Sequence, residues 1–130
     1  MLRVYTSEQN NEQVGPHFKV KEFACKDGSA ITFIDDYMVT ILELLRKELG
    51  NKPIIITSGY RTPAHNAKVG GAKYSYHMRG MAVDIRVNGT SAKEVAKALD
   101  KIVESCGIIV YESWVHFDVR DGKKYRKGMT

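Results

Sequence analysis

Residues 75–84 read Ser-Tyr-His-Met-Arg-Gly-Met-Ala-Val-Asp and hold the densest group of chemically useful side chains in the protein. The residues over 82–87 alternate between apolar and polar, which predicts a half-buried strand with Asp84 on its polar face. His77 comes just before Gly80, which favours a turn. A bend at Gly80 would therefore bring the imidazole of His77 close to the carboxylate of Asp84.

A second alternating stretch lies further along the chain. Residues 114–120 read Trp-Val-His-Phe-Asp-Val-Arg, which predicts another strand with His116 on its polar face. If the two strands pair, His77, Asp84 and His116 converge on one side of the sheet. Two histidines and one carboxylate form a familiar zinc-binding set in hydrolases. The spacing of the histidine and the aspartate alone also fits a surface ion pair, so this alternative stays open.

The remaining sequence predicts an α+β fold. The expected elements are helices over 34–49 and 91–104, strands over 53–57 and 108–110, and a structured loop over 58–76 with at most one helical turn. Thr32 and Ser91 resemble the residues that cap helix starts. The order of these elements favours helices packed on a small, mostly antiparallel sheet. Neither the first thirty residues nor the basic tail over 121–130 has a clear period, and we expect an exposed tail.

Composition narrows the class of protein. The chain has 130 residues, of which 43% are hydrophobic and 27% charged, and these values fit one globular domain over 1–130. The net charge of +5 favours an anionic partner such as nucleic acid, a lipid surface or a cell-wall polymer. No apolar run approaches the ~18 residues of a membrane helix, so we expect no membrane insertion. Cys25 and Cys106 are too few for a disulfide scaffold, which predicts two buried free thiols.

The two motifs resemble a known family. Ser-x-His-x-x-Gly-x-Ala-x-Asp over 75–84, followed by Trp-Val-His over 114–116, is similar to the zinc D-Ala-D-Ala peptidases. That family includes cell-wall carboxypeptidases, vancomycin-resistance dipeptidases and phage endolysins. Thr-Ser-Gly-Tyr-Arg-Thr-Pro over 57–63 and the segment 18–25 are also similar to it. The resemblance covers about 17–120 and implies the fold shared by these peptidases and the hedgehog signalling domains.

The resemblance also implies roles for individual residues. His77, Asp84 and His116 match the three ligands of a Zn²⁺ ion. Arg61 matches an arginine that binds the substrate or polarises its carbonyl, a role that suits a guanidinium donor. Ser75 matches a serine near the substrate, although capping the turn before His77 is an equal alternative for it.

One position departs from the family pattern. Studied relatives carry Glu or Asp three residues before the third ligand, where it acts as general base, and this sequence has Ser113 there. Glu112 is the nearest carboxylate, and in an extended strand it would share a face with His116. We therefore predict Glu112 as the general base. Asp118 shares the same face, but its place two residues beyond a ligand favours a supporting role.

The predicted function is a zinc metallopeptidase that hydrolyses an amide bond in the peptide part of peptidoglycan. The bond is left open between D-Ala–D-Ala, as in a carboxypeptidase, and L-Ala–D-Glu or an interpeptide bridge, as in an endopeptidase-type lysin. The alternative is a non-catalytic, zinc-containing module that binds the cell wall. Tyr74, Tyr76 and Trp114 fit either the lining of a glycan or peptide groove or ordinary packing beside a sheet.

Partners and location follow from weaker signals. There is no recognisable nucleic-acid-binding motif, so charge alone does not predict such a partner, and we expect a monomer. The N-terminus lacks the apolar segment of a signal peptide, which predicts synthesis in the cytoplasm. Together with the small size, this suggests a phage or prophage lysis enzyme that is released through a holin and acts on the cell wall.

Overall fold

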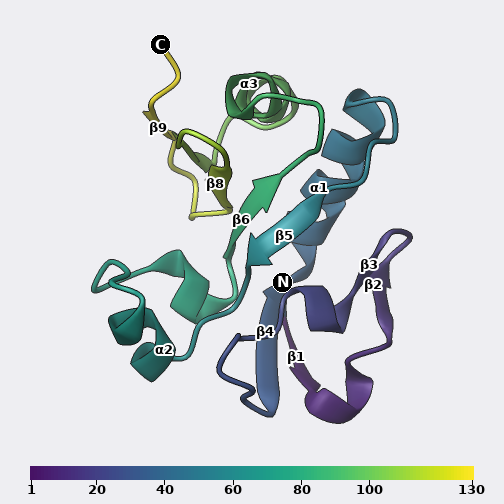
Figure 1. Ribbon diagram of the computed structural model, residues 1–130, viewed down its shortest axis with the longest axis vertical. Helices are drawn as coiled ribbons and strands as arrows, with labels where there is room; N and C mark the ends of the chain where they lie inside the picture. The colour runs from purple at the N-terminus through teal and green to yellow at the C-terminus, as the bar shows by residue number, and fades with distance from the viewer.

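The computed structural model describes all 130 residues and is built around a five-stranded sheet (Figure 1). The strand order is β5-β6-β8-β7-β9. The strands are β5 (Ile55–Ser58), β6 (Ala82–Arg86), β7 (Gly107–Val110), β8 (Val115–Asp118) and β9 (Tyr125–Lys127). All neighbours are antiparallel except β7 and β9, which run parallel. The predicted α+β class with a small, mostly antiparallel sheet is confirmed.

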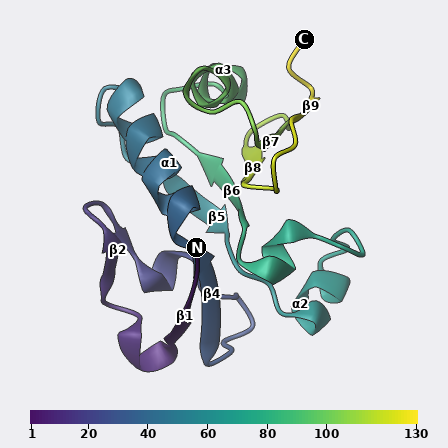
Figure 2. The same cartoon turned by 180° about the vertical axis from the view of Figure 1, so that it is seen from behind.

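The N-terminal third forms two small antiparallel sheets that the sequence did not predict. One pairs β1 (Leu2–Thr6) with β4 (Ile31–Asp35), and the other pairs β2 (Gln13–Gly15) with β3 (Phe18–Lys19). Two short 3₁₀ turns, η1 (Ser7–Gln9) and η2 (Val20–Glu22), connect these strands. Figure 2 shows that this part lies on the opposite side of the molecule from β9.

Helix α1 (Asp36–Glu48) begins two residues later than the predicted start at residue 34. The apolar period includes Ile34, but that residue belongs to β4 and pairs with β1. The cap is Asp35 instead of the predicted Thr32, because its carboxylate accepts hydrogen bonds from the backbone N–H groups of Tyr37 and Met38. A strand therefore leads directly into the helix.

Of the other two helices, one was predicted from the sequence and one was not. Helix α3 (Ala92–Ile102) begins at the predicted cap, where Ser91 Oγ accepts a hydrogen bond from Glu94 N at 3.2 Å. Helix α2 (Pro63–Lys68) lies in the segment predicted to contain at most one helical turn. Thr62 caps it and the proline occupies its first turn, and both features favour a helix start. This short helix was missed because it has no apolar period.

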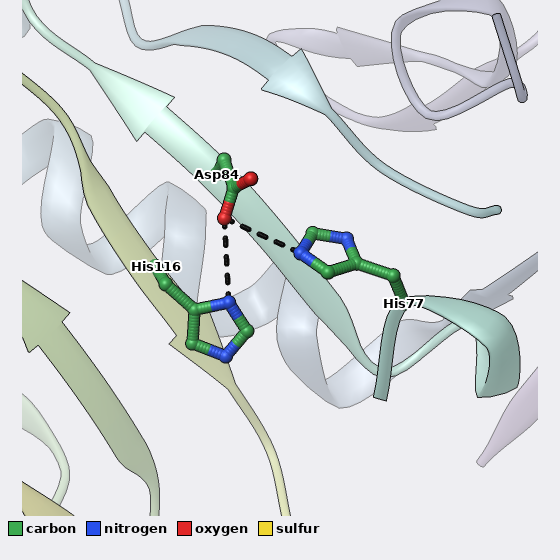
Figure 3. A group of neighbouring side chains, drawn as sticks. All are labelled: His77, Asp84 and His116. Carbon is green, nitrogen blue, oxygen red and sulfur yellow. Dashed lines mark hydrogen bonds and ion pairs between the residues drawn. The ribbon is translucent and has the colours of Figure 1, made fainter. Parts of the chain in front are cut away.

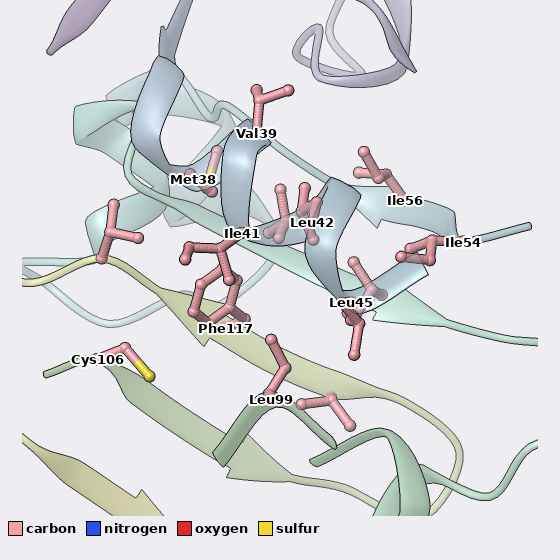
Figure 4. Packing of buried hydrophobic residues seen from close by; sticks show 14 of the residues in the cluster. Met38, Val39, Ile41, Leu42, Leu45, Ile54, Ile56, Leu99, Cys106 and Phe117 are labelled. Carbon is pink, nitrogen blue, oxygen red and sulfur yellow. The ribbon is translucent and has the colours of Figure 1, made fainter. Parts of the chain in front are cut away.

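The hydrophobic core lies between the sheet and helices α1 and α3 (Figure 4). Leu42 of α1, Leu99 of α3 and Phe117 of β8 are fully buried there. Because side chains alternate along a strand, the same alternation leaves Asp84 of β6 and His116 of β8 on the opposite face of the sheet. The packing of the helices therefore decides which face carries the polar residues.

Three further predictions concern the cysteines, the C-terminal tail and membrane-spanning helices. Cys25 and Cys106 are buried and unpaired, as predicted. The tail is exposed over most of its length, but residues 125–127 form β9 and Arg126 donates to Asp100 Oδ1 at 2.7 Å. No helix has the length and apolar character that crossing a bilayer requires.

Candidate metal centre

His77, Asp84 and His116 come together on the polar face of the sheet (Figure 3). Asp84 on β6 and His116 on β8 are directly opposite each other in the antiparallel register. His77 comes from η3 (Tyr76–Arg79), the 3₁₀ turn that precedes β6. Each residue offers one ligand atom, and these atoms lie within 4.8 Å of one another. A single metal ion could contact all three.

A glycine makes the turn between His77 and β6. Gly80 has a φ of +68°, a conformation that L side chains rarely adopt. A Cβ at this position would also overlap the backbone carbonyl of Phe33 in β4. The close neighbour of Gly80 is thus the backbone of β4. Gly80 therefore fixes how the turn carrying His77 packs on the N-terminal strands.

The ring of His77 is held from behind. Its Nδ1 lies 2.7 Å from the carbonyl oxygen of Gly59, and because a carbonyl only accepts, Nδ1 carries the proton. The lone pair of Nε2 is then directed toward Asp84 Oδ1, 3.3 Å away. The backbone N–H of His77 donates to Ser75 Oγ at 3.2 Å, so Ser75 makes the capping contact that was one of its two predicted roles.

The ring of His116 is held in the reverse orientation. Its Nε2 lies 2.7 Å from Asp118 Oδ2, while its Nδ1 lies 3.3 Å from Asp84 Oδ1. Asp118 is completely buried and accepts two hydrogen bonds from the guanidinium of Arg120, at 2.7 and 2.6 Å, and one from the backbone N–H of Arg120 at 3.3 Å. A ring that donates through Nε2 leaves the lone pair of Nδ1 for the cluster. Arg120 takes part in this arrangement, and sequence reasoning missed it.

Charges reinforce the arrangement. When no metal is bound, the histidine nitrogens that face Asp84 can carry a proton in place of the ion. Burial raises the pKa of Asp84, but the hydrogen bonds donated by His116 and His77 in that state, and their charge, outweigh burial and hold the pKa well below its usual range. For His116, burial lowers the pKa, while the hydrogen bonds to Asp118 and Asp84 raise it by more. A metal ion would displace those protons and would meet an ionised carboxylate and two imidazole lone pairs. This donor set, with its tautomers fixed by partners outside the cluster, fits Zn²⁺.

Arg61 reaches the cluster from the loop before α2. Its Nη2 donates to Asp84 Oδ2 at 3.3 Å, on the side of the carboxylate away from the histidines. Its Nε donates to Ser58 Oγ at 3.1 Å and its Nη1 to Asn66 Oδ1 at 3.2 Å. Asn66 is buried and donates to the carbonyl of Ala72 at 2.8 Å, so it links Arg61 to the next loop. The guanidinium is therefore fixed beside the metal centre.

The structure does not place Glu112 near the cluster. β8 begins at Val115, and the backbone N–H of Tyr111 donates to the carbonyl of Trp114 at 2.9 Å, which closes a turn through Glu112 and Ser113. Glu112 therefore lies in the hairpin turn and not in the extended strand that its assignment as general base assumed. Glu112 is exposed and is not among the residues that line the cleft.

A cleft of about 450 Å³ opens above the cluster. Arg61 and Ser75 line it together with the three clustered residues, and Asp84 is the only carboxylate in its lining. The cleft is also lined by Tyr74, Tyr76 and Trp114. Lining a groove was one of the two alternatives predicted for these three aromatic residues. His17 and His65, the other histidines of the chain, are not part of the cluster.

An open cleft above two histidines and one carboxylate, held by two paired strands and the turn before one of them, is typical of a metal-dependent hydrolase. A model of the peptidase M15 family matches residues 16–118, and the chain belongs to that family. It is also 36% identical over 72 residues to the zinc D-Ala-D-Ala carboxypeptidase of Streptomyces albus G. That match covers 54% of this chain and 28% of the relative, so the chain spans less than a third of that protein. The predicted family is confirmed.

Proposed function

We propose that this protein is a zinc metallopeptidase that hydrolyses an amide bond in the peptide part of peptidoglycan. The observation that carries the proposal is the orientation of the two imidazole rings. Gly59 O and Asp118 accept from the outer nitrogens of His77 and His116, so both inner nitrogens are directed at Asp84. The family and the name of the Streptomyces relative support the same substrate class.

His77, Asp84 and His116 would hold the ion. Zinc bound there supplies Lewis-acid chemistry, which polarises a carbonyl and makes water more acidic. Arg61 would donate a charge-assisted hydrogen bond to the substrate oxygen on which negative charge develops. Its contacts with Ser58 and Asn66 hold the guanidinium in place before the substrate arrives.

Asp118 and Arg120 support His116 from the side that faces away from the proposed ion. Asp118 keeps the Nε2 proton on His116, and Arg120 fixes the carboxylate with two hydrogen bonds. Asp118 is completely buried, so it does not contact the substrate. Its proposed role is therefore to position His116, which agrees with the supporting role that the sequence favoured.

Purified peptidoglycan tests the proposed function. Incubation with the protein should release new free amino groups, and both a chelator and the substitution His116→Ala should abolish this release. Zinc bound at one ion per chain without any new amino groups would instead favour the alternative, a zinc-containing module that binds the wall. Mass spectrometry of the fragments identifies the bond that is cut. Monomeric state and a holin-dependent role in phage lysis stay predictions.

A further inference from the structure

Tyr and Trp residues are distributed differently from Phe residues in this protein. Five of the eight Tyr and Trp side chains line the cleft above the metal centre, and none of the four Phe does. The five are Tyr74, Tyr76, Tyr111, Trp114 and Tyr125. Tyr and Trp offer a flat apolar face together with a polar group that hydrogen-bonds. Their concentration here indicates a surface for a ligand that has both apolar faces and polar groups.

Cations cover three of these five rings. Arg120 lies over Tyr76 at 4.8 Å and over Tyr125 at 4.7 Å, and Lys73 lies over Tyr74 at 5.4 Å. No cation lies over Tyr111 or Trp114. The pair formed by Tyr111 and Trp114 is therefore the part of the aromatic lining that can take an uncharged ring.

The Tyr111–Trp114 pair is preorganised. The two rings stack with their centroids 4.5 Å apart and their planes 10° from parallel. They flank the turn between β7 and β8, whose closing hydrogen bond joins their backbones at 2.9 Å. Tyr111 remains 42% exposed, so the stack is not buried in the core. A ligand would meet a rigid aromatic surface and would lose little energy in ordering it.

This surface adjoins the metal centre. Trp114 lies directly before β8 and precedes His116 by two residues, which places their Cα atoms roughly 7 Å apart. That distance corresponds to about two residues of an extended peptide. A group bound on the stack would therefore lie within about two residues of the bond at the metal.

We propose that the Tyr111–Trp114 stack binds an N-acetylated pyranose ring of the substrate, a proposal that rests on the proposed function. The C–H face of a pyranose is flat, apolar and uncharged, and its hydroxyl and acetamido groups can pair with polar groups of the surrounding Tyr side chains. Because the stack is so close to the metal, the bond cut is one of the first in the peptide, near its attachment to the sugar. A bond at the far end of the peptide does not meet this geometry.

The single tryptophan reports directly on this subsite. The disaccharide of N-acetylglucosamine and N-acetylmuramic acid, without any peptide, should change the fluorescence of Trp114 in a saturable way. The peptide without sugar should change it far less. Tyr111→Ala keeps the probe and should weaken disaccharide binding roughly three- to tenfold. Tyr37→Ala, which removes an exposed tyrosine from α1, is the matched control and should bind like the parent.

The disaccharide has no peptide bond, so this test does not depend on hydrolysis. Loss of peptidoglycan cleavage with intact sugar binding would contradict the proposed function and leave the sugar subsite standing. No response to the disaccharide, or an equal response to the peptide alone, would overturn the subsite. Should Tyr111→Ala fail to fold, calorimetric titration of Trp114→Phe provides the same comparison. A cut at the far end of the peptide would contradict the inferred position of the bond.

Discussion

The Nε2–H of His116 donates to the carboxylate of Asp118 across 2.7 Å, and this carboxylate is completely buried. A neutral imidazole has one donor and one acceptor nitrogen, so this contact decides that Nδ1 is the nitrogen offered to the cluster. Arg120 fixes the carboxylate from the other side. The candidate metal centre therefore depends on Asp118 and Arg120, which are not among its three clustered residues.

Asp118→Asn should weaken zinc binding about 10- to 100-fold, the usual cost of losing a partner behind a metal-binding histidine. The amide would present an N–H to a donor of Arg120 or of His116, and one of these contacts must be lost. Zinc affinity is measured by competition with a chromogenic chelator. Asp121→Asn removes an exposed carboxylate three residues away and should bind zinc like the parent. If both variants bind zinc with equal affinity, Asp118 does not contribute to metal binding.

The same carboxylate predicts how stability depends on pH. Burial raises the pKa of Asp118, but the hydrogen bonds from Arg120 and His116 outweigh it and lower the pKa from the ordinary 3.8 to about 2. A carboxyl whose pKa is lower in the folded state stabilises the fold above pH 4, and this stabilisation is lost as the pH falls toward 2. The difference corresponds to roughly 2 kcal/mol at neutral pH.

Urea unfolding between pH 6 and pH 2.5, with chelator present, measures this contribution. The parent should be more stable than Asp118→Asn at pH 6, and the gap should shrink as the pH falls. A gap that is the same at both ends of the range would show that the charge of Asp118 contributes nothing.

Gly107→Ala should destabilise the protein by about 1–3 kcal/mol, as expected when an atom is forced into a packed site. A Cβ at Gly107 would overlap the carboxylate oxygens of Asp118 and lie 2.6 Å from Nη2 of Arg120. Unfolding in urea measures the loss, and zinc affinity should fall with it. In an Asp118→Ala background the same substitution should cost much less. If Gly107→Ala lowers the free energy of unfolding equally in both backgrounds, the destabilisation does not come from overlap with Asp118.

Most of the site could be predicted because it depends on strand alternation. The period-two patterns around Asp84 and His116 assign each residue to the polar face of its strand, and the core on the other face makes that assignment firm. The structure adds the register that sets these two residues opposite each other. Register depends on pairing between distant segments, which a single strand pattern does not contain.

The residues that were missed act through long-range contacts. Asn66 connects Arg61 to the carbonyl of Ala72, and Arg120 connects Asp118 to the rings of Tyr76 and Tyr125. No periodicity marks such contacts. Strand β9 was missed for a related reason, since its residues are mainly basic and it forms only by pairing with β7. The available signal was the even spacing of Arg120 from His116 and Asp118, which predicts that all three share one face of the strand.

Arg61→Ala should retain one zinc per chain and lose about 10²-fold or more in hydrolysis rate. All three proposed metal ligands stay in place, while the donor proposed for the substrate oxygen is removed. Metal analysis and the rate of amine release test the two parts separately. Arg86→Ala, which removes an exposed arginine at the end of β6, is the control and should keep the parental rate. Loss of zinc in Arg61→Ala would mean that Arg61 acts by holding Asp84.

Glu112 provides the sharpest difference between the sequence and the structure. If Glu112 were the general base, replacing it with glutamine would lower turnover ~10²–10⁴-fold, the usual worth of a positioned acid–base group. The structure places it in the turn between β7 and β8, exposed and outside the cleft lining. We therefore expect Glu112→Gln to keep turnover within about twofold of the parent, since a group outside the site has no proton to accept.

Amine release from peptidoglycan at saturating zinc measures this turnover, and Glu104→Gln, another exposed glutamate, is the matched control. If Glu112→Gln alone loses activity while zinc content and unfolding stay parental, the hairpin tip must close over the cleft when substrate binds. In that case the sequence-based assignment of Glu112 is right, and the open arrangement seen here precedes substrate binding. If both variants keep their activity, Glu112 is not the base, and Asp84 remains the only carboxylate in the cleft lining. Proton transfer would then proceed without a dedicated carboxylate base on this chain.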